Sequence, residues 1–168
     1  MRNTARARYW ISLAAVSVLL AGACSKTADA PVTTPPKPDS TANVVFTGGT
    51  IKAEIASTGP AREAGLMGRT ALATDAGMLF VFLFDQQPEI VGFWMKGTPL
   101  PLSIAFMDAN RRVLAVQDMT PFDTVTIHRP TTPYRYALEV NRGWFAAHGV
   151  AAGATATFTL PPTTVITP

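Results

Sequence analysis

The fold is decided by an uninterrupted apolar run at residues 77–84, which reads Gly77-Met78-Leu79-Phe80-Val81-Phe82-Leu83-Phe84. This run is too short for most helices and rich in aromatic side chains, so it predicts a strand buried on both faces. Similar short apolar segments, separated by Gly, Pro, Asp and Asn, follow it along the chain. We therefore predict a mainly β fold, either a sandwich or a barrel-like sheet, with one or two short helices and with α+β as the alternative.

The remaining elements are predicted from alternation and turn residues. In residues 50–56, Ile51, Ala53 and Ile55 share one face, as in a half-buried strand. Pro60 is suited to the first turn of a short helix at 60–67, and a helical turn is expected at 143–148. The other predicted strands are 44–46, 91–95, 102–107, 112–117, 134–140 and 154–160.

The first 23 residues have the composition of a secretory signal peptide. Three arginines and no acidic residue precede an uncharged stretch at 9–23. At ~1.5 Å per residue, these 15 residues would span about 22 Å as a helix, which is short of the ~30 Å hydrocarbon core. A basic start, a short apolar stretch and small residues at its end are typical of an export signal.

Cys24 is the single cysteine of the chain, so an intramolecular disulfide is excluded. Ala21-Gly22-Ala23 before it resembles the lipobox of bacterial lipoproteins, although Ala21 stands where leucine is usual. The resemblance implies that Cys24 carries a lipid such as palmitate and becomes the mature N-terminus. The alternatives are an ordinary signal cut after Ala23 and an uncleaved membrane anchor.

The segment after Cys24, residues 25–43, contains four prolines and little to bury. Such a composition predicts a flexible tether, so we expect a single domain at 44–168 attached to a membrane. In lipoproteins that resemble this one, Ser25 after the cysteine goes with the outer membrane, facing the periplasm, if the cell has two membranes.

The basic balance of the chain does not indicate a nucleic-acid partner. The chain has 14 Lys and Arg against 11 Asp and Glu. Three of the arginines lie in the predicted leader, so its removal leaves 11 basic and 11 acidic groups. A nucleic-acid-binding protein would need a basic stripe that survives this removal.

Five motifs occur in an order that resembles the bacterial and archaeal family called domain of unknown function 192. They are Gly65-Leu66-Met67-x-Arg69, Gly77-Met78-Leu79-Phe80-Val81-Phe82, Phe93-Trp94-Met95-Lys96-x-Thr98, Pro101-Leu102 and Ala137-Leu138-Glu139. The resemblance covers roughly residues 50–158. It implies a compact, mainly β fold of sandwich type and implies no particular reaction. Gly97 and Ser103 depart from the family pattern, which usually has Asn and Asp at these two positions.

The charged and aromatic residues of these motifs form the candidate ligand-binding site. On a strand, Trp94, Lys96 and Thr98 would share one face, where a sugar or a carboxylate ligand could bind. Arg69 and Glu139 are the other charged residues within the family motifs. Glu139 lies in an otherwise apolar strand, and because an isolated buried charge is costly, we expect it to face solvent or to be paired. A purely structural Arg69–Glu139 or Lys96–Glu139 ion pair is the alternative.

Three functions remain open, and no catalytic residue or cofactor is assigned. The leading hypothesis is a non-enzymatic envelope module that binds a small ligand, a glycan or an envelope protein. The second is an envelope hydrolase or transferase that uses Glu139, for which Asp118 and Asp123 near His128 offer a weaker alternative. The sequence has no GxSxG, P-loop or HExxH motif.

The third hypothesis is copper handling by methionine and histidine, whose thioether and imidazole groups suit that metal. The methionines are widely spaced and alternate with other apolar residues, which favours core filling instead. We therefore assign no metal site. The residues concerned are Met67, Met78, Met95, Met107, Met119, His128 and His148.

Overall fold

The computed structural model describes residues 40–168, so the predicted leader, the predicted lipidation site Cys24 and most of the predicted tether lie outside the described residues. The first strand, β1 (Thr41–Phe46), begins three residues earlier than predicted, inside the segment that we assigned to the tether. Its side chains alternate between exposed and buried, with Ala42, Val44 and Phe46 directed into the core. Small and polar residues at its start hid this alternation in the sequence.

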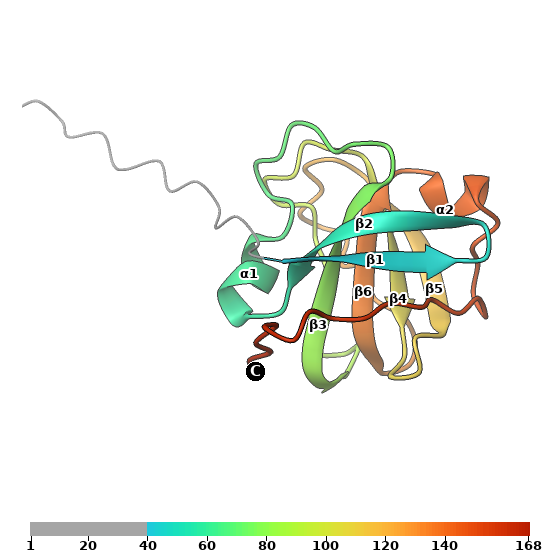
Figure 1. The fold of residues 1–168 in the computed structure, drawn as a ribbon. Coiled ribbons are helices and arrows are strands. Elements are labelled where there is room, and N and C mark those ends of the chain that lie inside the picture. The colour runs from blue at the N-terminus through green and yellow to red at the C-terminus, as the bar shows by residue number, and fades with distance from the viewer. Residues whose placement is uncertain (1–39) are drawn as a thin grey trace, which may run out of the picture. The chain divides into compact units, whose positions relative to one another are not determined.

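The described residues form one six-stranded mixed sheet, which confirms the mainly β prediction. The strands lie in the order β1-β2-β3-β6-β4-β5, and β2 and β3 are parallel while the other neighbours are antiparallel. The sheet curves strongly across the molecule (Figure 1). The strands after β1 are β2 (Gly49–Ala56), β3 (Ala76–Gln86), β4 (Leu102–Met107), β5 (Val113–Met119) and β6 (Tyr134–Asn141).

Two short helices accompany the sheet, as predicted. They are α1 (Gly59–Ala64) and α2 (Trp144–Ala147), and Pro60 does occupy the first turn of α1. None of the helices in residues 40–168 has the length and apolarity needed to cross a membrane.

The strand β3 contains the apolar run that decides the fold, and it lies between β2 and β6 in the middle of the sheet. Both of its faces are buried from Gly77 to Phe82, as expected for a strand covered on two sides. The prediction is wrong for its last two apolar residues. Leu83 and Phe84 are 39% and 65% exposed, because the pairing of β3 with β6 becomes irregular after Val81.

The two faces of the sheet bury separate cores. One core contains Leu79, Val81 and Leu138, and we call it the inner core because the curved sheet folds around it. The other contains Phe80, Phe106 and Ala137, and is covered by chain segments outside the sheet; we call it the outer core. Successive residues of one strand alternate between the two cores, which explains why β3 and β4 read as continuous apolar runs.

The predicted strand 154–160 is wrong as a continuous strand, because the structure has only isolated bridges there. Thr157 bridges Val45 of β1, and Thr155 bridges Arg112 just before β5. Residues 155–157 therefore connect the two edge strands, β1 and β5, and make the sheet barrel-like where they cross between them. The chain then returns toward α1 (Figure 1), where Ser57 Oγ donates to the carbonyl of Val165 at 2.7 Å.

The predicted strand 91–95 is also wrong. Phe93 makes one isolated bridge to His128, and the rest of the segment is irregular. Gly92 and Gly97 flank the apolar residues, and Gly97 has a φ of +65°, which breaks strand alternation. Trp94 and Thr98, predicted to share a face, differ accordingly: Trp94 is 48% exposed and Thr98 is buried.

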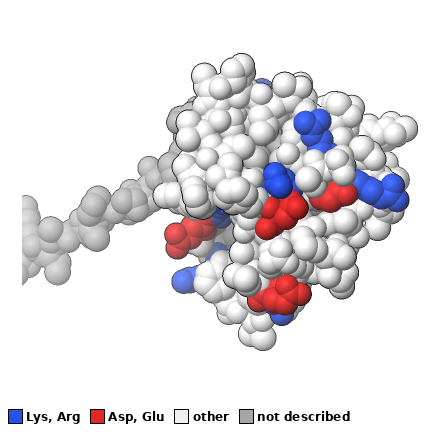
Figure 2. Space-filling model, turned by 90° about the horizontal axis from the view of Figure 1, so that it is seen from below, with Lys and Arg blue, Asp and Glu red and all other residues white. Residues whose placement is uncertain are grey.

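The surface charges are mixed in sign. On the face shown in Figure 2, acidic side chains lie beside basic ones and neither sign forms a continuous stripe. Three ion pairs occur among the described residues: Arg69–Glu54, Arg135–Asp85 and Arg142–Asp118.

Candidate functional site

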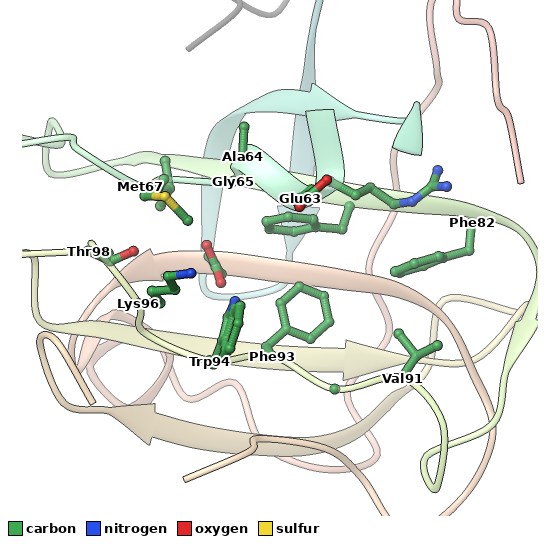
Figure 3. Close-up of a pocket in the computed structure, with 15 residues that line it drawn as sticks. Glu63, Ala64, Gly65, Met67, Phe82, Val91, Phe93, Trp94, Lys96 and Thr98 are labelled. Carbon is green, nitrogen blue, oxygen red and sulfur yellow. The ribbon is translucent and has the colours of Figure 1, made fainter. Parts of the chain in front are cut away.

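A pocket of about 270 Å³ opens between α1 and residues 91–98, over the outer-core side of the sheet (Figure 3). The helix and the loop after it form one wall, residues 91–98 form the opposite wall, and β3 and β6 contribute side chains from the sheet. The lining residues are Arg62, Glu63, Ala64, Gly65, Leu66, Met67, Phe80, Phe82, Val91, Gly92, Phe93, Trp94, Lys96, Thr98 and Glu139.

The helix α1 is fixed in place largely by Arg62. Its guanidinium donates to the carbonyls of Ser57 at 2.7 Å, Val81 at 3.1 Å and Thr167 at 2.9 Å, and lies 4.9 Å from the centre of the Phe82 ring. Burial lowers the pKa of Arg62 from its usual value. Because its donors already bind three carbonyls, Arg62 stabilises the pocket wall and the C-terminal segment, and offers little to a ligand.

The opposite wall is held by backbone hydrogen bonds to residues 122–128. Phe93 and His128 exchange two N–H···O bonds of 2.8 and 2.7 Å, and the Met95 N–H donates to the Asp123 carbonyl at 2.9 Å. Phe93 also packs edge-on against Phe80, with ring centres 4.9 Å apart. These contacts direct Met95 inward and leave Trp94 at the pocket.

Lys96 lies beside Trp94 in this wall (Figure 3). Its Nζ is 5.2 Å from the centre of the Trp94 ring, close enough for a cation–π interaction. Lys96 forms no ion pair within residues 40–168. The ammonium therefore remains available to a ligand.

Glu139 is the most unusual residue of the pocket. It lies in the middle of β6, between Met78 of β3 and Ile104 of β4, and is 5% exposed. Its carboxyl makes no hydrogen bond or ion pair with the described residues, and desolvation raises its pKa to about 8. At neutral pH the group is therefore mainly a protonated acid, which can donate a hydrogen bond.

The unpartnered oxygens of Glu139 are open to the pocket. Within residues 40–168, two polar side-chain atoms are inaccessible to solvent and have no hydrogen-bond partner: His128 Nε2 and Thr164 Oγ1. The carboxyl oxygens of Glu139 also have no partner among these residues, but they remain accessible because Glu139 lines the cavity. A buried acid that faces a pocket with a strongly shifted pKa is a typical mark of a functional site.

Four of the five residues predicted for ligand binding line this pocket: Trp94, Lys96, Thr98 and Glu139. Arg69 does not. Its guanidinium forms a two-pronged ion pair with Glu54 at 2.6 and 3.0 Å, which raises the pKa of Arg69. Neither of the two structural ion pairs predicted for Glu139 is formed.

The sequence predicts the helix but not its place at a pocket, and it does not predict the aromatic walls. Phe80 and Phe82 are predicted only as part of a strand buried on both faces, and Phe93 only as part of a strand at 91–95. Their shared pocket depends on contacts between segments far apart in the chain. The one local signal is glycine: Gly65 and Gly68 follow α1, and Gly92 and Gly97 flank residues 93–96.

The two departures from the family pattern leave the pocket intact. Ser103 lies on the opposite face of the sheet from Glu139, because its neighbour Ile104 pairs with Glu139. Its hydroxyl donates to Asp118 at 2.6 Å and accepts from the Gly143 N–H at 2.9 Å. Gly97 has left-handed backbone, which asparagine tolerates better than most residues, but a Cβ at this position would lie 2.8 Å from Met67 Cγ, so asparagine would also require Met67 to shift.

The weaker candidates for a hydrolytic site, Asp118, Asp123 and His128, are engaged in contacts that stabilise the fold. The Asp123 carboxylate accepts hydrogen bonds from the backbone N–H groups of Val125 and Thr126. Hydrogen bonding, mostly from Thr126 and then from Val125, lowers the pKa of Asp123 to about 2. Buried His128 approaches Gln117 at 3.2 Å, and desolvation lowers its pKa. Asp118 is bound to Ser103 and Arg142, and both contacts lower its pKa.

Four of the five methionines in residues 40–168 are divided between the two cores, and Met67 lines the pocket. Met107 belongs to the inner core, whereas Met78, Met95 and Met119 belong to the outer core. His148 stacks on Trp144 with ring centres 4.0 Å apart. Within residues 40–168, no group of three or more His, Cys, Asp or Glu side chains is placed to hold a metal ion.

Comparison with known proteins identifies the family. Residues 42–158 match DUF192, described as Uncharacterized ACR. The chain belongs to the DUF192 family. No curated protein matches the chain.

Two solved structures are similar to this DUF192 chain. One, from Sinorhizobium meliloti 1021, is described as a "putative transcription regulator"; it is 30% identical, has a TM-score of 0.63, and the match covers 70% of this chain and 92% of the other. The second is a protein of unknown function from Novosphingobium aromaticivorans DSM 12444. It is 31% identical with a TM-score of 0.62, over 70% of this chain and 83% of the other.

Proposed function

We propose that this DUF192 protein is a binding module for a small ligand, held in the pocket between α1 and residues 91–98. The observation that carries the proposal is the Glu139 carboxyl, which is buried, open to the pocket and without a partner among residues 40–168. Burying such a group costs free energy that a structural role would normally offset with a hydrogen bond. A ligand that accepts from Glu139 would supply the missing partner.

The rest of the pocket supports the same proposal. Ligand sites are mostly apolar cavities with a few polar groups that fix orientation, and this one combines aromatic walls with Thr98, Lys96 and Glu139. Its volume of about 270 Å³ is near the lower end of such sites, which run from about 300 Å³. A single-ring ligand, such as one sugar unit of a glycan, suits this size.

In this proposal the pocket belongs to a lipid-anchored protein of the bacterial envelope, and the export signal and lipobox predicted in residues 1–24 support this location. In a two-membraned cell it would face the periplasm from the outer membrane. The ligand would then be an envelope metabolite, a glycan or a group on an envelope protein. Radiolabelled palmitate incorporation, with Cys24→Ala as the control, tests the anchor separately from the pocket.

A second candidate function is supported by the same carboxyl. An acid with a pKa near neutrality is suited to general acid catalysis, and desolvation raises the pKa of Glu139 to about 8. An envelope hydrolase or transferase would also need a second reacting group, and Glu63 is the other carboxylate that lines the pocket. Turnover that is lost in both Glu139→Gln and Glu63→Gln would favour this function over binding alone.

Trp94 fluorescence tests the binding proposal. We expect envelope sugars or small periplasmic metabolites to change the emission of the full-length protein, and the change to vanish in Trp94→Phe. That variant retains Trp10 of the predicted leader and Trp144, the buried first residue of α2, and so separates the pocket signal from the background. If no compound changes the signal and none is retained by the protein in equilibrium dialysis, the binding proposal is wrong.

A further inference from the structure

The pocket has two chemically different ends. Along β3 and β6, Phe80 pairs with Ala137 and Met78 pairs with Glu139, while Phe82 packs against Tyr134 with ring centres 5.7 Å apart. Glu139 and Phe82 therefore lie at opposite ends of the floor. Figure 3 shows the same division in the walls, with Thr98 and Lys96 at one end and Phe82 and Val91 at the other.

The polar end offers hydrogen-bond donors that the described protein leaves unused. Thr98 is 6% exposed, and its hydroxyl has no partner within residues 40–168 although it lines the cavity. Lys96 contributes an ammonium without an ion pair, and the protonated Glu139 contributes an O–H. Three donors that converge on one end of an apolar pocket complement an anionic group rich in acceptors.

The other charged groups that line the pocket lie outside its polar end. Arg62 on α1 is bound to three carbonyls, and its guanidinium lies 4.9 Å from the centre of the Phe82 ring, at the end with Phe82 and Val91. Glu63, also on α1, is exposed and lies across the pocket from Trp94 (Figure 3). The strands beside Glu139 present Met78 and Ile104, which carry no charge.

We propose that the ligand is a monocarboxylate with a compact apolar ring, its carboxylate between Lys96, Thr98 and Glu139 and its ring against Phe80, Phe93 and Trp94. This inference rests on the proposed function and specifies its ligand class. The aromatic walls suit the ring, because edge and face contacts between aromatic groups add to simple burial. The Lys96 ammonium balances the ligand charge, and the Glu139 O–H donates to one carboxylate oxygen.

This arrangement gives binding a characteristic pH dependence. A protonated Glu139 donates to the carboxylate, whereas an ionised Glu139 repels it. Binding of a carboxylate should therefore weaken as the pH rises past the titration of Glu139. An amine ligand would show the opposite trend, because its ammonium needs the ionised form of Glu139.

Three probes with the same ring and different end groups test the proposal: phenylacetate, phenylacetamide and 2-phenylethylamine. Their binding to the full-length protein is measured by calorimetry and Trp94 fluorescence at pH 6 and pH 9. We expect phenylacetate to bind tightest at pH 6, and to lose about tenfold or more in affinity at pH 9, as charge-assisted hydrogen bonds are lost. Lys96→Met should weaken phenylacetate by a similar factor and leave phenylacetamide nearly unchanged, with exposed Lys52→Met as the control.

The outcomes separate this inference from the proposed function. Tighter binding of the amine or the amide than of phenylacetate would refute the carboxylate class and leave a binding pocket in place. Phenylacetate binding that is insensitive to both pH and Lys96→Met would refute the assigned polar end. If none of the three probes binds and a wider panel of metabolites and sugars also fails, the proposed function itself is wrong.

Discussion

Replacing Glu139 by glutamine should stabilise the protein increasingly as the pH rises. Glutamine has the shape of the protonated acid and cannot ionise, so it removes the cost of keeping a carboxyl buried. Desolvation raises the pKa of Glu139 from 4.5 to about 8. Between these values the unfolded chain releases a proton that the folded chain retains, so the free energy of unfolding of the native protein falls as the pH rises.

The size of this effect follows from the shift in pKa. Each unit corresponds to about 1.4 kcal/mol, so the penalty is close to zero at pH 4, about 3 kcal/mol at pH 7 and at most about 5 kcal/mol above pH 8. Domains of this size are stable by only about 5–15 kcal/mol, so the effect is large enough to measure. It is an upper limit, because local relaxation around an ionised Glu139 would reduce it.

Urea unfolding of the two proteins between pH 4.5 and pH 8.5 measures the difference. The stability gained by Glu139→Gln should grow steadily over this range, while Glu89→Gln, an exposed glutamate, should show no such trend. A difference that is constant with pH would show that Glu139 does not titrate abnormally. A difference that shrinks as the pH rises would show that the ionised carboxylate is stabilised in the fold, which would refute the reasoning.

Four further outcomes are expected. Arg69→Met should cost less than about 1 kcal/mol in urea unfolding and leave probe binding unchanged, because its ion pair is partly exposed and neither partner lines the pocket. A loss of binding would return Arg69 to the site. Arg62→Met should cost about 2–4 kcal/mol and speed hydrogen exchange near Thr167, whose carbonyl it binds; unchanged exchange would mean that the C-terminal segment is held by other contacts. Both Gly97→Asn and Gly97→Val place a Cβ 2.8 Å from Met67 Cγ, but Gly97→Val should cost at least about 1–2 kcal/mol more, roughly the penalty of left-handed backbone for a β-branched residue. Equal thermal midpoints of the two variants would contradict this. Burial lowers the pKa of His128, so the unfolded chain takes up a proton at this residue before the folded chain does, and the free energy of unfolding should fall as the pH drops below about 6.5. A His128 resonance that titrates at or above pH 6.5 by NMR would contradict this prediction.

The regular part of the fold could be predicted because burial on alternating faces leaves a local pattern. The run in β3 and the alternation of Ile51, Ala53 and Ile55 both gave correct strands. Residues 91–95 and 154–160 show a similar apolar content, yet their partners are single residues in distant segments. Alternation alone cannot distinguish a strand in a sheet from an extended segment that covers one.

The site could be predicted only in part. Trp94, Lys96, Thr98 and Glu139 were found because they lie in motifs shared with a family, and the structure brings them to one pocket. Arg69 lies in a motif too, but its partner Glu54 is on β2 and carries no signal that links the two. The state of Glu139 depends on desolvation by the covering segments, and this cannot be read from β6 alone.

The most direct test of the central claim is an NMR map of where phenylacetate binds at pH 6. The pocket predicts that amide shifts concentrate in residues 62–67, in residues 91–98 and around Glu139, and that Lys96→Met and Glu139→Leu, which removes the hydrogen-bond donor, both weaken them. Shifts that concentrate elsewhere, for example around Trp144 and His148, or that survive both substitutions, would contradict the claim that this pocket is the functional site.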